Sequence, residues 1–178
     1  MQTPRPYGQT GLLLNPLGLG AAQIGDPTLD DAAVGRMLHA AVDTGVNLFD
    51  TAPSYGISED RIGRHLAARR SEVVLSTKLG YGVAGIPDWT GACITAGIEQ
   101  ALRLLHTDHL DIAHFHSCPR QVLEQTDVID ALEAAKRAGK VRAIGASNHS
   151  APRLAEALRT SAELGLPRYE SLQPLYNL

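Results

Sequence analysis

The chain of 178 residues is poor in cysteine and in aromatic residues, and neither sign of charge dominates it. Two cysteines, Cys93 and Cys118, are too few for a disulfide framework, so a reducing cytoplasm is the expected compartment. A formal net charge of −3, with acidic and basic residues interspersed, gives no reason to expect a nucleic-acid partner. Apolar runs are short, so we expect no membrane span, and the first residues lack the apolar stretch of a signal peptide.

What the chain does contain is a series of short β-rich runs at an even spacing. Their starts are separated by 29, 27, 37, 31 and 29 residues, which is the length of one βα unit. Helical patterns lie between them; Val34, Leu38 and Val42, for example, follow the spacing of an amphipathic helix. The predicted strands are residues 17–23, 46–50, 73–78, 110–116, 141–148 and 170–175.

Strands that alternate with helices predict a parallel sheet with right-handed crossovers. A doubly wound open sheet and a (β/α) barrel both satisfy this pattern. The even repeat favours the barrel, because the predicted strands end in polar residues and barrel active sites collect at that edge. These residues are Asp50, Lys78, His116, Asn148 and Gln173.

The chain length limits how much of a barrel can be present. A complete (β/α)8 TIM barrel takes ~250 residues, whereas the pattern here gives six strands and five helices within residues 1–178. We therefore expect one domain of incomplete barrel type, with about six βα units and without the C-terminal ones. Its two sheet edges would be open to self-association. The predicted helix N-caps are Thr28 (with Asp31), Ser58, Thr90 and Ser150.

Four residues at or near the strand ends have matching chemistry: Asp50, Tyr55, Lys78 and His116. A phenol has a pKa near ~10, and a nearby ammonium favours its ionised form. A carboxylate paired with the ammonium keeps it charged and in place. An imidazole on the next strand end can hydrogen-bond a substrate oxygen. Such a set can protonate the alkoxide that forms when a carbonyl is reduced, with the tyrosine as general acid.

Each of these residues also has a simpler interpretation. Asp50 and Tyr55 are then turn residues, Lys78 is a surface lysine, and His116 is a satisfied core histidine on the same side of the strand as His114. The pair His114 and His116 is compatible with a metal site, but no further ligands recur at metal-binding spacing, so no metal is expected. A Schiff base on Lys78 requires an uncharged amine, which an aspartate partner disfavours.

The motifs, taken together, are similar to those of the aldo-keto reductase family. "GVNLFDTAPSYGISEDRIG" resembles the family signature, in which a strand-end Asp precedes a loop Tyr and S-E-x-x-x-G. "STK" resembles the family's lysine strand, and "LDIAHFH" resembles its L-D-x-x-x-x-H strand. "AKRAGKVRAIGASN" and "LQPLYNL" match the segments that end in Ser-Asn and that carry Q-x-x-Y-N. These motifs occur in family order over nearly the whole chain.

The resemblance implies a catalytic tetrad of Asp50, Tyr55, Lys78 and His116. It also implies that Ser147, Asn148 and Gln173 hold the carboxamide of a nicotinamide cofactor, NADP(H) or NAD(H). The amides of Asn and Gln suit that purpose, since they offer both a donor and an acceptor. Family members continue with further βα units that complete the cofactor site, so the resemblance implies weak NADPH binding by this chain alone.

The resulting hypothesis is an NAD(P)H-dependent oxidoreductase acting on a small carbonyl substrate, an aldehyde, a ketone or a sugar lactol. Tyr55 is its general acid/base, and no nucleic acid or membrane takes part. The alternative hypothesis is a truncated, catalytically silent barrel fragment that serves as a binding or scaffold protein.

Overall fold

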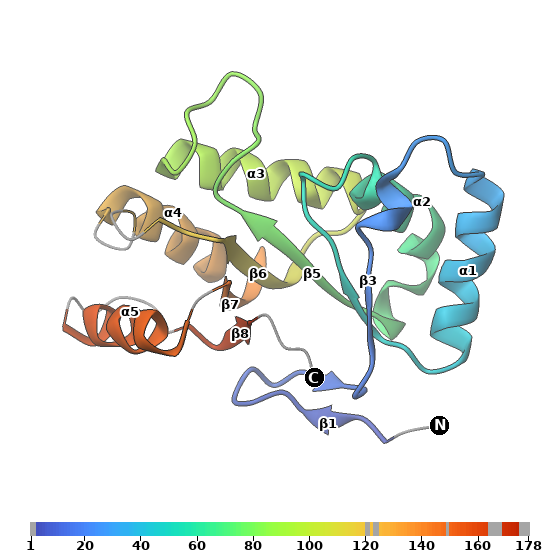
Figure 1. Ribbon diagram of the computed structural model, residues 1–178, viewed down its shortest axis with the longest axis horizontal. Helices are drawn as coiled ribbons and strands as arrows, with labels where there is room; N and C mark the ends of the chain where they lie inside the picture. Colours follow the sequence, from blue (N-terminus) through green and yellow to red (C-terminus); the bar gives the residue numbers. More distant parts are fainter. Residues whose placement is uncertain (1–2, 120–121, 123–124, 149, 164–168, 175–178) are drawn as a thin grey trace.

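The computed structural model describes residues 3–119, 122, 125–148, 150–163 and 169–174. Strands and helices alternate along the chain after a short N-terminal hairpin (Figure 1). The strands are β1 (Arg5–Pro6), β2 (Leu13–Leu14), β3 (Gly18–Gly20), β4 (Leu48–Asp50), β5 (Val74–Leu79), β6 (Leu110–His116), β7 (Val141–Ser147) and β8 (Ser171–Gln173). The helices are α1 (Asp31–Asp43), α2 (Ser58–Leu66), α3 (Gly91–Leu104), α4 (Thr126–Arg137) and α5 (Ala151–Glu163), with the 3₁₀ turns η1 (Gln23–Gly25) and η2 (Ala67–Glu72).

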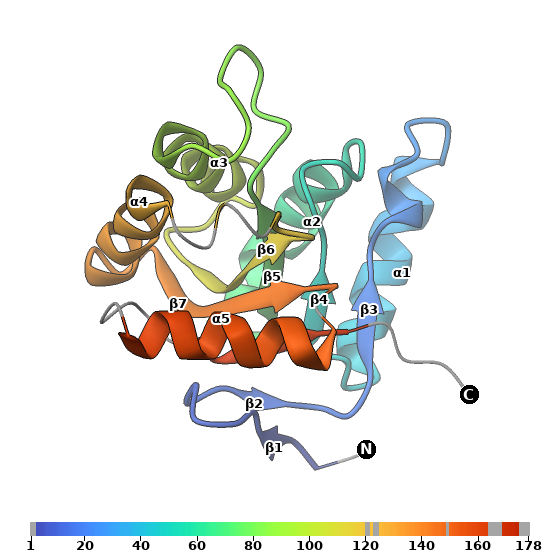
Figure 2. The same ribbon diagram turned by 60° about the vertical axis from the view of Figure 1, so that its left-hand side comes forward.

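The six strands β3 to β8 form one parallel sheet in chain order. Helices follow the strands and cover the outer side of this curled sheet, as Figures 1 and 2 show. Each of the six predicted strands is present, with shorter bounds in β3, β4 and β8. This architecture matches an incomplete (β/α)8 barrel and confirms the predicted fold class.

Two apolar clusters pack against the sheet, one under the helices and one under the hairpin β1–β2. The larger cluster lies between sheet and helices and includes Phe49 and Leu75 of the strands with Leu38 of α1. The smaller cluster joins the inner face of the sheet to the hairpin β1–β2, which the sequence pattern did not predict. Its buried members are Leu12, Leu14, Val74, Ile112 and Ala143.

The hairpin covers the amino end of the sheet. The Asn47 side chain, just before β4, donates a hydrogen bond to the Leu13 carbonyl oxygen (2.8 Å) and accepts one from the Asn15 amide (2.8 Å). The hairpin therefore closes the inner face of the sheet at its amino end.

The observed helix N-caps agree only in part with those predicted from the sequence. Thr90 caps α3, because its hydroxyl accepts a hydrogen bond from the Cys93 amide (3.1 Å). The cap of α1 is Asp30 rather than Thr28. Ser58 as the cap of α2 is wrong: it is the first helical residue, and its buried hydroxyl donates to the Ala21 carbonyl oxygen at 2.8 Å. Its function is to join α2 to the segment after β3.

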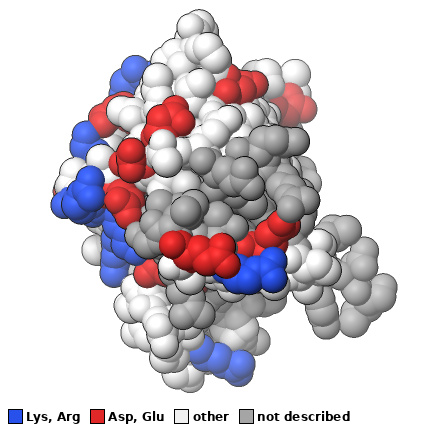
Figure 3. Space-filling view, turned by 90° about the vertical axis from the view of Figure 1, so that its left-hand side faces the viewer, with Lys and Arg blue, Asp and Glu red and all other residues white. Residues whose placement is uncertain are grey.

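Figure 3 shows the charged side chains of the described residues on one face of the molecule. On the face in Figure 3, acidic and basic side chains of the described residues lie interspersed. In the part of the chain that the structure describes, no helix has the length and apolar character to cross a bilayer.

Candidate active site

The strand register brings the predicted polar residues to one face of the sheet. Residues paired across parallel strands project to the same side, as do residues two apart in one strand. Asp50 pairs with Ser76, Lys78 with His114, and His116 with Ser147, which in turn pairs with Gln173. These pairs link β4, β5, β6, β7 and β8. The side chains therefore line the inner face at the carboxyl edge of β4 to β8.

The centre of the site is a buried ion pair. Lys78 Nζ lies 2.7 Å from Asp50 Oδ2 and donates a second hydrogen bond to the Thr51 carbonyl oxygen (2.9 Å). The other carboxylate oxygen of Asp50 accepts a hydrogen bond from Ser76 Oγ (2.8 Å). The lysine side chain is 3% exposed, so it is not the surface lysine of the simpler interpretation. These partners hold the amino group of Lys78 in a fixed position.

Tyr55 lies above this ion pair on the loop between β4 and α2. Lys78 Nζ is 5.1 Å from the centre of its ring. The loop is held by a close backbone approach: the Ile57 amide donates to the Gly25 carbonyl oxygen (3.1 Å). A Cβ on Gly25 would lie 1.7 Å from the Tyr55 carbonyl oxygen, so only glycine fits there. The position of the phenol is thus set by η1 as well as by its own loop.

The two histidines of β6 differ in their surroundings. The His114 ring is buried and hydrogen-bonded on both nitrogens, to Ser76 Oγ (3.2 Å) and Ser171 Oγ (2.9 Å). Burial, followed by the charges of Lys78 and His116, lowers the pKa of His114 to about 4, against the effect of Asp50. The satisfied core histidine of β6 is thus His114, whereas the simpler interpretation of the sequence gave that place to His116.

His116 lies at the exposed end of the same strand and is only partly buried. Burial, and secondly the charge of Lys78, lowers its pKa below the usual value, although Asp50 acts in the opposite direction. The Tyr55 ring meets the His116 ring edge-on, with centres 6.3 Å apart. The imidazole is therefore favoured in its neutral form beside the phenol.

Titration of His114 predicts a loss of stability in acid. Its folded pKa lies below the unfolded value of 6.5, so the unfolded state binds more protons between these values. Its stabilising contribution is complete above pH 6.5 and is lost as the pH falls towards 4, by up to about 3 kcal/mol of unfolding free energy. The buried carboxyl of Glu59 has a raised pKa and acts in the opposite sense.

Denaturant unfolding of wild type and His114→Asn between pH 4 and 8 isolates this contribution. The difference between the two unfolding free energies should shrink as the pH falls. As a control, the unfolding free energy of a variant with Asn in place of the exposed His106 should depend on pH as that of the wild type does. A constant difference between wild type and His114→Asn would contradict the assigned neutral state.

The three predicted amide-binding residues meet at the ends of β7 and β8. The Asn148 amide donates to the Gln173 carbonyl oxygen (3.0 Å), and the Asn148 side chain donates to Ser117 Oγ (2.7 Å). Ser147 is buried, whereas Asn148 is exposed and Gln173 is partly exposed. A hydroxyl and two carboxamides in one group offer donors and acceptors that fit a nicotinamide carboxamide. Tyr176 and Asn177 of the matching motif lie outside the described residues.

Sequence reasoning missed Tyr81, which follows Lys78 by three residues. Its hydroxyl lies 2.7 Å from His116 Nδ1, and the two rings stack with centres 5.0 Å apart. Trp89 packs against Tyr81 at 6.2 Å and against Phe115 at 6.1 Å. The tyrosine in "STKLGYG" was the sequence feature that could have indicated this contact. A tyrosine in a loop, however, does not by itself indicate contact with the end of a neighbouring strand.

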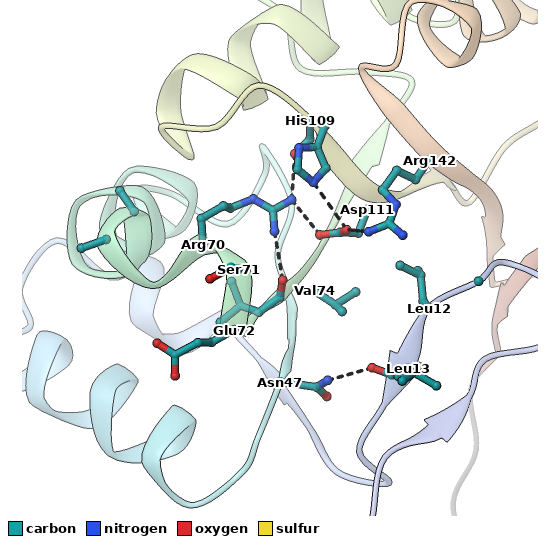
Figure 4. Close-up of a pocket in the computed structure, with 14 residues that line it drawn as sticks. Leu12, Leu13, Asn47, Arg70, Ser71, Glu72, Val74, His109, Asp111 and Arg142 are labelled. Atoms are coloured by element: carbon teal, nitrogen blue, oxygen red, sulfur yellow. Dashed lines mark hydrogen bonds and ion pairs between the residues drawn. The ribbon is translucent and has the colours of Figure 1, made fainter.

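A hollow lies at the amino edge of the sheet, opposite the candidate site. It encloses about 690 Å³ beside Leu12, Val74 and the arginines Arg70 and Arg142 (Figure 4). Asp111 lies between these arginines, with one carboxylate oxygen 2.8 Å from Arg70 Nη2 and the other 2.9 Å from Arg142 Nη1. This hollow contains none of the predicted site residues, and Asp111 holds both of its arginines. In the part of the chain that the structure describes, no three His, Cys, Asp or Glu side chains are placed to hold a metal ion.

Comparison with known proteins places these features in a family. The sequence profile of the aldo/keto reductase family matches residues 16–178. L-galactose dehydrogenase of Arabidopsis thaliana is 35% identical over 79% of this chain and 47% of its own length. D-threo-aldose 1-dehydrogenase of a Pseudomonas species is 32% identical over 88% of this chain and 56% of its own length. A crystal structure described as an aldo-keto reductase from Pseudomonas aeruginosa is 37% identical, with a TM-score of 0.77 over 88% of this chain and 64% of that protein. The chain thus spans about half the length of the curated relatives it matches.

Proposed function

The chain belongs to the aldo/keto reductase family, and we propose that it carries the catalytic residues of an NAD(P)H-dependent oxidoreductase. The reaction interconverts an aldehyde, ketone or sugar lactol and the corresponding alcohol or lactone. The observation that carries the proposal is the buried Lys78–Asp50 pair, 2.7 Å apart, directly beneath the Tyr55 ring. A turn, a surface lysine and a loop tyrosine would have no reason to assemble in this way.

A reduced nicotinamide, when bound, supplies the hydride that is added to the carbonyl carbon. The hydroxyl of Ser147 and the carboxamides of Asn148 and Gln173 would hold its amide group. In reduction, Tyr55 gives its phenolic proton to the carbonyl oxygen, which becomes the alcohol hydroxyl. In oxidation, the phenolate takes that proton back from the alcohol.

The ion pair supports both directions through electrostatics. The Lys78 ammonium stabilises the negative charge that develops on the phenol oxygen as the proton leaves. Asp50 and the Thr51 carbonyl oxygen fix the ammonium, because together they accept two of its hydrogen bonds. Ser76 in turn fixes the carboxylate. Little reorganisation is then needed when charge moves, which is the source of catalytic power in a preorganised site.

The substrate class is suggested by the relatives. Two of them bear the names of dehydrogenases acting on L-galactose and on D-threo-aldoses. We propose aldoses and small sugar lactols as the first substrates to assay, followed by simple aldehydes. In this reaction neutral His116 would donate a hydrogen bond to the reacting oxygen and orient it.

Cofactor binding provides the direct test. Trp89 is the single tryptophan and packs near the site, so NADPH or NADH should change its fluorescence saturably. Gln173→Glu keeps the shape of the side chain but removes its amide donor, and should raise the Kd about tenfold. Gln9→Glu, an exposed change in the hairpin loop, should leave the Kd unchanged. The absence of a fluorescence response at millimolar cofactor, with a folded protein and no turnover of any aldose or aldehyde, would refute the proposed function.

A further inference from the structure

Tyr81 makes the most specific contact with the candidate site that the tetrad does not include. It lies on the loop between β5 and α3, and its hydroxyl oxygen is 2.7 Å from His116 Nδ1. The two rings also stack, with centres 5.0 Å apart and planes inclined by 19°. A hydrogen bond and a stacking contact between the same two side chains restrict both the tilt and the rotation of the imidazole.

We infer that Tyr81 is a positioning residue, which donates its hydroxyl proton to His116 Nδ1 and so fixes the imidazole as the tautomer protonated on Nε2. In a neutral imidazole one nitrogen is a donor and the other an acceptor, and the partner of one nitrogen decides the state of the other. A phenol hydroxyl is a better donor than acceptor, and a bare imidazole nitrogen is the better acceptor of the two groups. The pairing from Tyr81 to Nδ1 therefore uses the stronger donor and the stronger acceptor.

The groups around His116 support a neutral ring. Lys78 brings a positive charge, and its partner Asp50 offsets that charge only in part. Tyr55 meets the ring edge-on from another side. With the ring neutral, a single N–H has to be placed on one nitrogen or the other.

The loop geometry keeps Tyr81 in place. The Trp89 amide donates to the Gly80 carbonyl oxygen (2.7 Å), which closes the loop that carries Tyr81. A Cβ on Gly80 would lie 2.3 Å from the Trp89 ring, so the tryptophan packs directly over this glycine. The Trp89 ring also packs against the tyrosine, with ring centres 6.2 Å apart. The hydroxyl is thus held by packing as well as by its hydrogen bond.

The catalytic consequence rests on the proposed function. An Nε2–H can donate to a carbonyl oxygen and favours the charge that develops there, whereas a bare Nε2 would present a lone pair to it. Tyr81 would thus determine whether His116 attracts or repels the reacting oxygen, although it touches neither substrate nor cofactor itself.

Nitrogen NMR of histidine-labelled protein near pH 7.5 tests the inference without any substrate. In the wild type, His116 Nδ1 should show the shift of an unprotonated nitrogen and Nε2 that of a protonated one. Tyr81→Phe keeps the stacked ring and removes the hydroxyl, so Nδ1-protonated imidazole should appear and both shifts should become intermediate. His116→Asn identifies the signals by their disappearance. Turnover by Tyr81→Phe should fall about 2–10-fold in kcat with little change in KM.

Tyr7→Phe is the matched control, because its hydroxyl contacts Ser171 Oγ (2.7 Å), which pairs with His114 and not with His116. It should leave the His116 shifts unchanged. A wild-type Nδ1 that carries the proton, or a Tyr81→Phe protein with wild-type shifts, would overturn the inference. If the shifts agree but the protein reduces no carbonyl, the tautomer assignment stands and the proposed function fails, so the two failures are distinguishable.

Discussion

Replacing Tyr55 by Phe is expected to lower the rate of carbonyl reduction by about 10²–10⁴-fold, which is the contribution of a general acid that touches the reacting atoms. The substitution removes one oxygen atom and keeps the ring above Lys78. Cofactor affinity should change little, because the residues proposed to hold the nicotinamide amide lie on β7 and β8. Steady-state rates with the best aldose or aldehyde, together with the Kd for NADPH, measure the two effects separately.

The folded state provides the control for this experiment. The unfolding free energies of Tyr55→Phe and wild type should agree closely, since the loop is held by backbone contacts to Gly25. Tyr7→Phe removes a hydroxyl of the same kind near the hairpin and should retain most of the activity. Undiminished turnover in Tyr55→Phe would exclude this phenol as the proton donor, even in a protein shown to be an active reductase.

In the proposed site, the acid Tyr55 lies on a loop and the charges that support it lie on strands. Lys78 and Asp50 are fixed by strand register, so their separation does not depend on any loop conformation. The Tyr55 loop approaches them from above and is anchored on η1 by the Gly25 contact. A rigid pair of charges beneath an anchored phenol satisfies the requirement that catalytic groups be preorganised.

Much of this architecture could be predicted from the sequence, for identifiable reasons. The central strands β5, β6 and β7 are buried on both sides over nearly their whole length, so their sequences are mostly apolar. These apolar runs recur at a regular spacing. Polar residues at the strand ends were predicted to share an edge, because parallel strands place their carboxyl ends together. The hairpin was not predicted, since Arg5–Pro6 and Leu13–Leu14 are too short to show a period.

The spacing of residues in the sequence did not predict the contacts between loops and strand ends. Ser58 precedes a helical run and has the chemistry of an N-cap, yet its hydroxyl is turned towards the Ala21 carbonyl oxygen instead. The hydrogen bond from Tyr81 to His116 joins residues 35 positions apart in the chain, through a loop whose path depends on Trp89. Such pairings follow from the folded path of loops, which a one-dimensional spacing does not encode.

Replacing Asp111 by Ala is expected to destabilise the fold by about 3–5 kcal/mol of unfolding free energy, the cost of removing one partner of a buried ion pair. Its side chain is 2% exposed and accepts hydrogen bonds from Arg70, Arg142 and the Leu75 amide (2.9 Å), as Figure 4 shows in part. Alanine would leave the Leu75 amide and the largely buried Arg70 without this acceptor. Since small domains have only about 5–15 kcal/mol in all, the effect should be visible as a large shift of the denaturant midpoint.

Asp108→Ala is the matched control at the same edge of the sheet, because that carboxylate is 94% exposed and its ion pair is with His109. It should cost less than about 0.5 kcal/mol. Asp111→Asn retains an oxygen for the Leu75 amide and should lie between the two alanine variants. Because Asp111 is the second residue of β6, at the amino edge, and His116 ends the strand at the carboxyl edge, kcat of the folded fraction of Asp111→Ala should stay near that of the wild type. An Asp111→Ala protein as stable as Asp108→Ala would show that the two arginines are solvated well enough without their carboxylate, and the ion cluster would then contribute no stability to the sheet.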